Sequence, residues 1–340
     1  MRPIRKVLTF RASSIGDCLM GKYLLENIHV AYPEARCGIV VGSRASMIRD
    51  LFVAYPWLEI IEANRRSPAS LVALFKNFYG SDLVVTQYAG KAGGKFSFAS
   101  KIAARILTKK NGLIGFSDTS RFNGILYDTI IPFVPSTAPA ELEREALRAA
   151  RIPVMFEHPI MQYRPMSDIL TKFGLESGNY IIVHLFAGST GRGLHPDRKR
   201  ELLVALAQKL PHTQLVISGS VADKEEARHV SENIPAVIIA GEASLQELMN
   251  LIMHSHVVVS VDTGVAHITA QLGKPLIVLA TCLGLHWWGN EQYSKDALVT
   301  IFTCAGLCAG GHNAKPYPDC INEIDLETVA CNSRVILMVE

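Results

Sequence analysis

The sequence has few charged residues, little excess charge and no long apolar run. Charged residues make up 19% of the 340 residues and the formal net charge is +3, while hydrophobic residues reach 49%. This composition excludes a disordered chain and a strongly basic nucleic-acid-binding protein. No run approaches the roughly 18 apolar residues of a membrane span, and the apolar stretch near the N-terminus is too short for a signal peptide. We therefore expect a cytoplasmic protein of two domains, with no nucleic-acid partner.

Short apolar runs alternate with amphipathic helical stretches along both halves of the chain. The runs at 6–10, 37–42 and 82–88 in the first half have counterparts at 180–188 and 256–262 in the second. Runs rich in Val, Ile and Leu that alternate with helices predict parallel sheets covered on both faces. The sequence therefore predicts an α/β fold of two Rossmann-like domains that face each other across a cleft, with a proline-rich linker at 135–165.

Polar residues follow the predicted strands, where open α/β sheets bind their ligands. After the run that ends at Val261, Asp262 is placed as a helix N-cap, and Thr263 and Gly264 present amide groups suited to a phosphate. His267 lies one turn further on. The alternative is an ordinary aspartate cap beside a packing histidine.

A second polar segment spans residues 187–198. Ser189 and Thr190 supply hydroxyl groups, and Arg192 supplies a planar cation that suits phosphate. The segment matches neither a Walker loop nor a Rossmann fingerprint. Two anion-seeking segments on one sheet nevertheless support each other.

A third polar segment lies in the first half, where Ser14 and Gly16 precede Asp17 at the start of a helix. Asp17 is either an acid favoured in the first helical turn or a carboxylate that acts as a general base.

Three segments together resemble glycosyltransferase family 9, the ADP-heptose:lipopolysaccharide heptosyltransferases. They read "RASSIGD", "AGSTGRGLHPDR" and "VSVDTGVAHITAQLGKP", and the resemblance runs along nearly the whole chain. It implies a GT-B fold with an acceptor-binding domain at 1–160, a nucleotide-sugar-binding domain at 161–324, and a helix at 325–340 that packs back on the first domain. It also implies inverting, metal-independent transfer of heptose from ADP-heptose to an anionic, lipid-linked saccharide, with peripheral contact at the inner face of the inner membrane.

The resemblance also implies roles for individual residues. Asp17 matches the catalytic base, and Ser14 and Gly16 lie beside it on the acceptor side. Gly193 stands where the family often has a lysine, so Arg192 is the expected replacement cation. The donor-binding set comprises Ser189, Thr190, Arg192, Asp223, Asp262, Thr263, Gly264 and His267.

Basic residues are frequent in the first half and either form a solvated face or attract an anionic acceptor. They are Arg44, Arg49, Arg65, Arg66, Lys91, Lys95, Lys101, Arg105 and Arg121.

Four of the seven cysteines lie near the C-terminus, at Cys304, Cys308, Cys320 and Cys331. Four thiolates can hold zinc or iron in a structural site. The alternative is that the cysteines are simply buried, and no cofactor is expected to take part in catalysis.

Two other functions fit the same residues. One is a relative that glycosylates a protein or uses another nucleotide sugar. The other is a catalytically idle GT-B module that binds a nucleotide or a glycan. Retention of Asp17 together with the segment around Asp262 favours an active enzyme.

Overall fold

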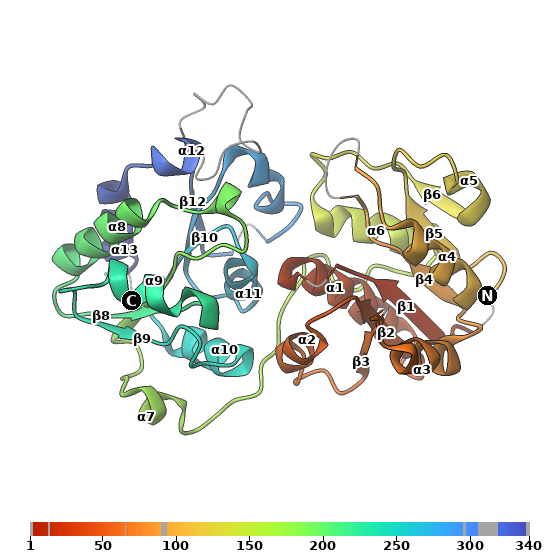
Figure 1. The fold of residues 1–340 in the computed structure, drawn as a ribbon, viewed down its shortest axis with the longest axis horizontal. Coiled ribbons are helices and arrows are strands. Elements are labelled where there is room, and N and C mark those ends of the chain that lie inside the picture. Colours follow the sequence, from red (N-terminus) through yellow and green to blue (C-terminus); the bar gives the residue numbers. More distant parts are fainter. Residues whose placement is uncertain are drawn as a thin grey trace. The chain divides into compact units, whose positions relative to one another are not determined.

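The chain forms two compact units, Met1–Pro159 and Ile160–Glu340 (Figure 1). The structure is a computed structural model and describes residues 3–12, 14–64, 66–89, 94–294, 297–304 and 319–337. Each unit contains one six-stranded sheet in which all pairings are parallel. The prediction of two parallel α/β domains is therefore confirmed.

The first unit has the strand order β3-β2-β1-β4-β5-β6. Its strands are β1 (Lys6–Phe10), β2 (Arg36–Val41), β3 (Leu58–Glu62), β4 (Leu83–Val85), β5 (Leu113–Phe116) and β6 (Thr129–Ile131). Its helices are α1 (Ile15–Ala31), α2 (Ala45–Leu51), α3 (Pro68–Phe78), α4 (Phe98–Leu107), α5 (Asn123–Leu126) and α6 (Pro139–Ala149).

The segment expected to be a linker, 135–165, contains helix α6, which packs on α1 within the first unit. Pro139 occupies the first turn of α6, where a proline needs no hydrogen-bond acceptor for its nitrogen. Leu142, Ala146 and Leu147 are buried on its apolar side. The prolines around this segment therefore mark a helix start as well as a connection.

The second unit has the strand order β12-β11-β10-β7-β8-β9. Its strands are β7 (Tyr180–His184), β8 (Gln214–Ile217), β9 (Ala236–Ile238), β10 (Val258–Val261), β11 (Leu276–Leu279) and β12 (Val299–Phe302). Its α-helices are α7 (Ile169–Phe173), α8 (Pro196–Lys209), α9 (Lys224–Val230), α10 (Leu245–His254), α11 (Gly264–Gln271), α12 (Asp319–Asn322) and α13 (Leu326–Leu337). Its short 3-10 helices are η1 (Thr190–Arg192), η2 (Val221–Asp223) and η3 (Cys282–Trp287).

The last described helix, α13, packs on α8 of the second unit. Val329 and Ala330 of α13 are fully buried in the same core cluster as Leu202 and Leu206 of α8. A contact of this helix with the first domain stays a prediction. The apolar side of the helix is already used within the second unit.

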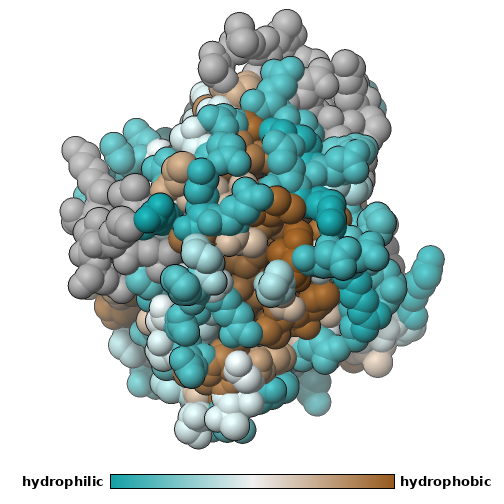
Figure 2. Space-filling model, turned by 90° about the vertical axis from the view of Figure 1, so that its left-hand side faces the viewer, coloured by the Kyte–Doolittle hydropathy of each residue, from teal (hydrophilic) through white to brown (hydrophobic). Residues whose placement is uncertain are grey.

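Apolar residues gather on one face of the second unit. Figure 2 shows them near the middle of this face, with polar residues around them. None of the helices in the described part of the chain has the length and apolarity needed to cross a membrane.

His184 is a buried histidine at the end of β7, beside the polar segments of this sheet. Its Nδ1 lies 3.0 Å from the hydroxyl of Ser218, which directly follows β8. Burial lowers the pKa of His184 to about 4, although nearby Asp223 acts in the opposite direction. The ring is therefore neutral at pH 7, and it supplies no positive charge to a bound phosphate.

This histidine predicts a loss of stability in mild acid. A histidine in the unfolded chain is protonated below about pH 6.5, whereas folded His184 is protonated only below a pKa of about 4. The unfolded chain therefore binds more protons between these values, and unfolding becomes more favourable as the pH falls. The contribution is complete above pH 6.5 and decreases by about 3 kcal/mol by pH 4. We expect His184→Asn to flatten the pH dependence of unfolding by urea in this range. The matched replacement of exposed His212, His212→Asn, should leave the pH dependence of the wild type unchanged, and an equal effect of both would contradict the assignment.

Candidate functional site

The polar segments of the second unit follow neighbouring strands. Strands β7 and β10 pair directly and run parallel, so the segments after His184 and after Val261 leave the same edge of the sheet. Arg192 of the first segment lies close enough to Asp262 of the second to lower the pKa of that carboxyl group. The structure therefore brings together two of the predicted donor-binding segments.

Asp262 is a carboxylate held in a nearly dry position. The residue is 4% exposed, and His267 Nε2 lies 3.5 Å from its Oδ1. Burial acts to raise the pKa of Asp262, but His267, Arg192 and Trp288 outweigh it, so the pKa stays below the usual value. Apart from that longer contact, Oδ1 has no hydrogen-bond partner among the described residues. It is available to accept a hydrogen bond from a ligand hydroxyl group.

The helix after Asp262 begins one residue later than expected. Thr263 is the N-cap of α11 and makes no side-chain capping bond, so Asp262 is not the cap. The Asp262 side chain instead lies beside His267 and against Gly284, where a Cβ atom would come within 2.5 Å of Oδ2. The amide groups at the start of α11 thus remain without a side-chain cap, as an anion site requires.

His267 is 5% exposed and lies among aromatic rings. It stacks on Trp288 with ring centroids 4.3 Å apart, and Trp287 lies at 5.0 Å. Its Nδ1 lies 2.8 Å from the hydroxyl group of Tyr293. These contacts fix the ring so that Nε2 faces Asp262. The residues Trp287, Trp288 and Tyr293 were not predicted as part of the site, although a Trp-Trp pair shortly after an apolar run is a visible signal in the sequence.

The segment after β7 forms a short turn. Gly191 donates its amide hydrogen to the hydroxyl of Ser189 at 3.3 Å, and Arg192 donates its amide hydrogen to the Ser189 carbonyl at 3.1 Å. Thr190 begins the 3-10 helix η1, and the side chains of Ser189 and Arg192 are exposed. This turn therefore offers one hydroxyl group and one cation to the solvent beside Asp262.

Asp223 has a local structural role. Its Oδ2 accepts hydrogen bonds from the amide of Ser220 at 2.7 Å and from the hydroxyl of Ser220 at 2.6 Å, which forms a capping box at η2. The carboxylate lies after β8, the strand next to β7. A contact with the donor ribose stays a prediction for this residue.

Asp17 lies in the first turn of α1, directly after β1. The hydroxyl of the N-cap Ser14 donates to Asp17 Oδ2 at 2.5 Å and accepts from the Asp17 amide at 3.2 Å. Gly16 lies between them, and all three residues are at least partly exposed. The structure thus fixes the carboxylate of Asp17 at the carboxyl edge of the first sheet.

A buried ion pair lies close to Asp17. Arg11 Nη2 contacts both carboxylate oxygens of Glu143 at 2.7 Å, and both side chains are almost completely buried. Burial raises the pKa of Glu143 to about 7, with Arg11 opposing and Asp17 adding to the rise. Burial is the main cause that raises the pKa of Tyr88, and the charge of Asp17 is the next largest. The hydroxyl of Tyr88 has no hydrogen-bond partner among the described residues. Asp17 therefore contributes negative charge to a region of low polarity.

Two of the basic residues expected on the acceptor side are paired with carboxylates. Lys101 pairs with Asp118 at 2.7 Å inside the first unit, and Arg105 pairs with Asp128 at 2.8 Å. Lys101 is fully buried and cannot contact an acceptor from outside. Arg65 and Lys91 lie outside the described residues.

Three cysteines of the second unit come together. The Sγ atoms of Cys282, Cys304 and Cys320 all lie within 4.8 Å of one another. Cys282 follows β11, Cys304 follows β12, and Cys320 lies in α12. Cys331 is exposed on α13 and is not part of this group, which corrects the predicted set, and Cys308 lies outside the described residues. Cys282 was not predicted as a member because it is distant in sequence from the C-terminal cysteines.

The comparison with known proteins agrees with this geometry. Residues 195–281 match the model of glycosyltransferase family 9 (heptosyltransferase). Among curated proteins, no match to the chain was found. Many solved structures share the fold.

Three of these structures illustrate the likeness. A glycosyl transferase family 9 protein from Veillonella parvula DSM 2008 is 12% identical with a TM-score of 0.75, over 100% of this chain and 99% of that one. The ADP-heptose lps heptosyltransferase II of E. coli is 19% identical with a TM-score of 0.71, over 98% of both chains. The iron-containing dodecameric glycosyltransferase TibC of E. coli H10407 is 11% identical with a TM-score of 0.58, over 100% of this chain and 78% of that one.

At these identities the solved structures establish the GT-B fold alone, and the family match adds the identity of the segment that carries Asp262, Thr263, Gly264 and His267. The resemblance to glycosyltransferase family 9 is thereby confirmed for residues 195–281, the part of the chain that the family model matches.

Proposed function

We propose that the chain transfers a heptose from ADP-heptose to a hydroxyl group of an anionic lipopolysaccharide-core acceptor, with inversion and without a metal in the reaction. The observation that carries the proposal is the buried, charged Asp262 beside the uncapped start of α11, inside the segment that matches the heptosyltransferase family. The name of one similar protein, an ADP-heptose heptosyltransferase, supports the donor.

The second unit would hold the donor through two kinds of contact. The amide groups of Thr263 and Gly264, the hydroxyl of Ser189 and the cation of Arg192 suit the diphosphate, whose negative charge grows as it leaves. Asp262 cannot bind phosphate, because both carry negative charge. Its unpaired Oδ1 instead suits a hydroxyl group of the donor sugar.

The first unit would supply the base. As the acceptor oxygen bonds to the anomeric carbon and the bond to the diphosphate breaks, Asp17 would take the acceptor proton and ADP would leave with the electron pair. The hydroxyl of Ser14 donates to one oxygen of Asp17 and so orients the carboxylate.

The cysteine group fits a structural metal. Four sulfur ligands at about 2.3 Å from a tetrahedral zinc lie about 3.8 Å apart, and the three Sγ atoms lie within 4.8 Å of one another in a largely buried position. Cys282, Cys304 and Cys320 would hold zinc or iron. The metal would crosslink three segments and take no part in the transfer.

The donor assignment predicts selective binding of adenine nucleotides. We expect ADP to raise the melting temperature more than UDP or GDP at the same concentration. Asp262→Asn keeps the shape of the side chain but removes its charge, and it should weaken ADP-heptose binding at least tenfold in calorimetry. Asp168→Asn, at an exposed aspartate that precedes α7 and lies outside the donor-binding segments, is the control. Equal stabilisation by all three nucleotides, or none by any, would contradict the donor.

The base assignment predicts a loss of turnover without a loss of donor binding. Asp17→Asn should reduce the transfer rate by about 10²-fold or more, which is the usual contribution of a general base, while the dissociation constant of ADP-heptose stays within twofold. Asp50→Asn, on helix α2 of the same unit, is the control. Wild-type turnover in Asp17→Asn would refute the role of this carboxylate.

The cysteine group predicts about one zinc or iron per chain in elemental analysis of the purified protein. Cys282→Ser should lower the metal content and the melting temperature together, because it removes one buried ligand. Cys331→Ser is the matched control, since Cys331 is exposed and outside the group. A metal-free wild-type protein, or equal losses in both variants, would argue against the site.

A further inference from the structure

The buried ion pair of Arg11 and Glu143 joins three elements of the first unit. Arg11 directly follows β1, Glu143 lies in α6, and neither side chain is more than 1% exposed. The side chain of Arg11 also packs on α1, because a Cβ atom at Gly21 would lie 3.0 Å from Arg11 Cγ and 3.1 Å from Nε. Arg11 therefore links the helix that carries Asp17 to the helix that carries Glu143.

Asp17 lies one turn before Gly21 in α1. Residues four positions apart lie on the same face of a helix, so Asp17 is on the face of α1 that Arg11 contacts. Burial raises the pKa of the Cys18 thiol to about 12, and the charge of Asp17 adds to this rise while Arg11 opposes it. The same two charges act in the same directions on Glu143. Asp17, Arg11 and Glu143 thus form one electrostatic group.

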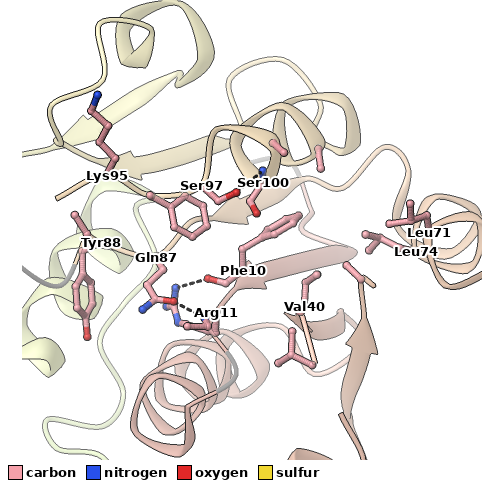
Figure 3. A pocket seen from close by; sticks show the side chains of 18 of the residues that line it. Phe10, Arg11, Val40, Leu71, Leu74, Gln87, Tyr88, Lys95, Ser97 and Ser100 are labelled. Carbon is pink, nitrogen blue, oxygen red and sulfur yellow. Dashed lines mark hydrogen bonds between the residues drawn. The ribbon is translucent and has the colours of Figure 1, made fainter. Parts of the chain in front are cut away.

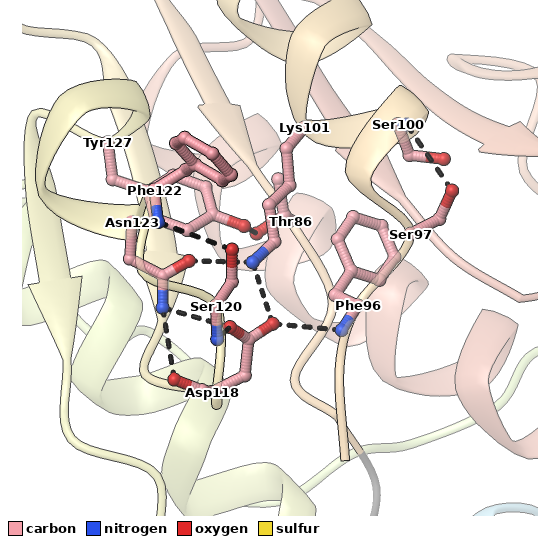
Figure 4. Close-up of polar contacts among 10 residues, drawn as sticks. All are labelled: Thr86, Phe96, Ser97, Ser100, Lys101, Asp118, Ser120, Phe122, Asn123 and Tyr127. Atoms are coloured by element: carbon pink, nitrogen blue, oxygen red, sulfur yellow. Dashed lines mark hydrogen bonds and ion pairs between the residues drawn. The ribbon is translucent and has the colours of Figure 1, made fainter.

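The second buried pair of this unit, Lys101 and Asp118, shows what a fully satisfied pair looks like (Figure 4). The carboxylate of Asp118 accepts four hydrogen bonds at 2.7–2.9 Å, from the amides of Phe96 and Ser120, the amine of Lys101 and the side-chain amide of Asn123. Burial acts to raise the pKa of Asp118, but these donors outweigh it and hold the pKa below its usual value. This carboxylate therefore keeps its charge.

Glu143 is much less well satisfied. In the described part of the chain, only Arg11 donates hydrogen bonds to it, through Nη2, and burial raises its pKa to about 7. Nε of Arg11 and the hydroxyl of Tyr88 have no hydrogen-bond partner among the described residues. Native proteins satisfy most buried polar groups, and perturbed groups of this kind cluster at functional sites. The Arg11–Glu143 pair is therefore suited to a change of charge.

Two charged groups act on Glu143 within the described residues, Arg11 and Asp17. Burial raises the pKa values of the three other titratable groups around the pair and keeps them neutral at pH 7; these are Cys18 and Tyr23 of α1 and Tyr88 after β4. Strand β6, which also packs on α6, contains only threonine and isoleucine. The charge on Glu143 therefore depends on Arg11 and Asp17.

The pair also borders a pocket of the first unit. Arg11, Gln87 and Tyr88 line this pocket, which has a volume of about 550 Å³ and lies at the carboxyl ends of β1, β2 and β4 (Figure 3). Glu143 is fully buried and is not among the lining residues. It can therefore act on a reaction at this edge only through Arg11 and Asp17.

We propose that Glu143, acting through Arg11, is a positioning residue that sets the pH range in which Asp17 acts as the base. The inference rests on the proposed function for the role of Asp17. When Glu143 is neutral, the positive charge of Arg11 is unbalanced and makes Asp17 a weaker base. When Glu143 is ionised, it neutralises Arg11 and repels the charge of Asp17, so Asp17 takes the acceptor proton more readily. The two carboxyl groups titrate as a coupled pair.

The first test is the pH dependence of kcat/KM for transfer, from mild acid to mild base. The wild-type value should rise in two steps, the second near pH 7, where Glu143 ionises. Glu143→Gln should lack the second step, and its remaining rise should lie about one pH unit lower, because Arg11 is no longer balanced. Glu141→Gln is the matched control, since Glu141 is also in α6 but pairs with Arg144 and Arg148. It should keep the wild-type profile.

The second test does not depend on the folding of Glu143→Gln. Carboxyl ¹³C NMR of the full-length protein labelled in glutamate follows the ionisation of Glu143 directly. One glutamate signal should titrate near pH 7 in the wild type and at lower pH in Asp17→Asn, because the charge of Asp17 acts to raise the pKa of Glu143. Asp50→Asn, in α2 of the same unit, should leave this titration unchanged.

The outcomes separate this inference from the assignment of the base. The same titration of Glu143 in the wild type and in Asp17→Asn would overturn the inference. A Glu143→Gln profile that is reduced equally at every pH would also overturn it, because a purely structural role has that effect. Wild-type turnover in Asp17→Asn, with the shifted glutamate signal present, would instead refute the proposed base.

Discussion

Every strand pairing within each sheet is parallel, and the location of the candidate site follows from this constraint. Parallel strands end at the same edge, so residues that follow different strands become neighbours however far apart they are in sequence. Asp262 and Arg192 meet in this way after β10 and β7. Asp17 and the pocket-lining Gln87 occupy the equivalent edge of the first sheet, after β1 and β4.

Buried charges fix the backbone at these edges. The pairs Arg11–Glu143 and Lys101–Asp118 are almost entirely removed from water, which costs free energy that a surface pair does not lose. Such pairs are weak evidence for stability, but each requires one geometry to satisfy its donors and acceptors. Arg11–Glu143 joins the end of β1 to α6, and Lys101–Asp118 joins α4 to the segment after β5. Both positions are where a preformed site needs a rigid support.

The sequence predicted the central strands well because each is buried on both faces and appears as a continuous apolar run. It missed β6 and β12, two of the four edge strands, whose residues are largely exposed or partly exposed and give a weaker pattern. Asp262 was recognised by type and position, but its dry environment depends on Gly284 and the aromatic residues around His267, which approach only in the folded chain. The cysteine group could not be predicted in full for the same reason. Cys282 and Cys304 follow β11 and β12, and they become neighbours only because these two strands pair in the folded sheet.

The cysteine group and the surroundings of Asp262 share one short segment. The 3-10 helix η3 begins with Cys282 and ends with Trp287, and between them Gly284 packs against Asp262. Trp288, directly after η3, stacks on His267. A crosslink at Cys282 would therefore hold the segment that encloses Asp262 and keeps water from its carboxylate. Because a carboxylate exposed to water would lose part of its strength as a hydrogen-bond acceptor for a ligand, a metal bound by the cysteine group would influence how well this site is formed even from a distance.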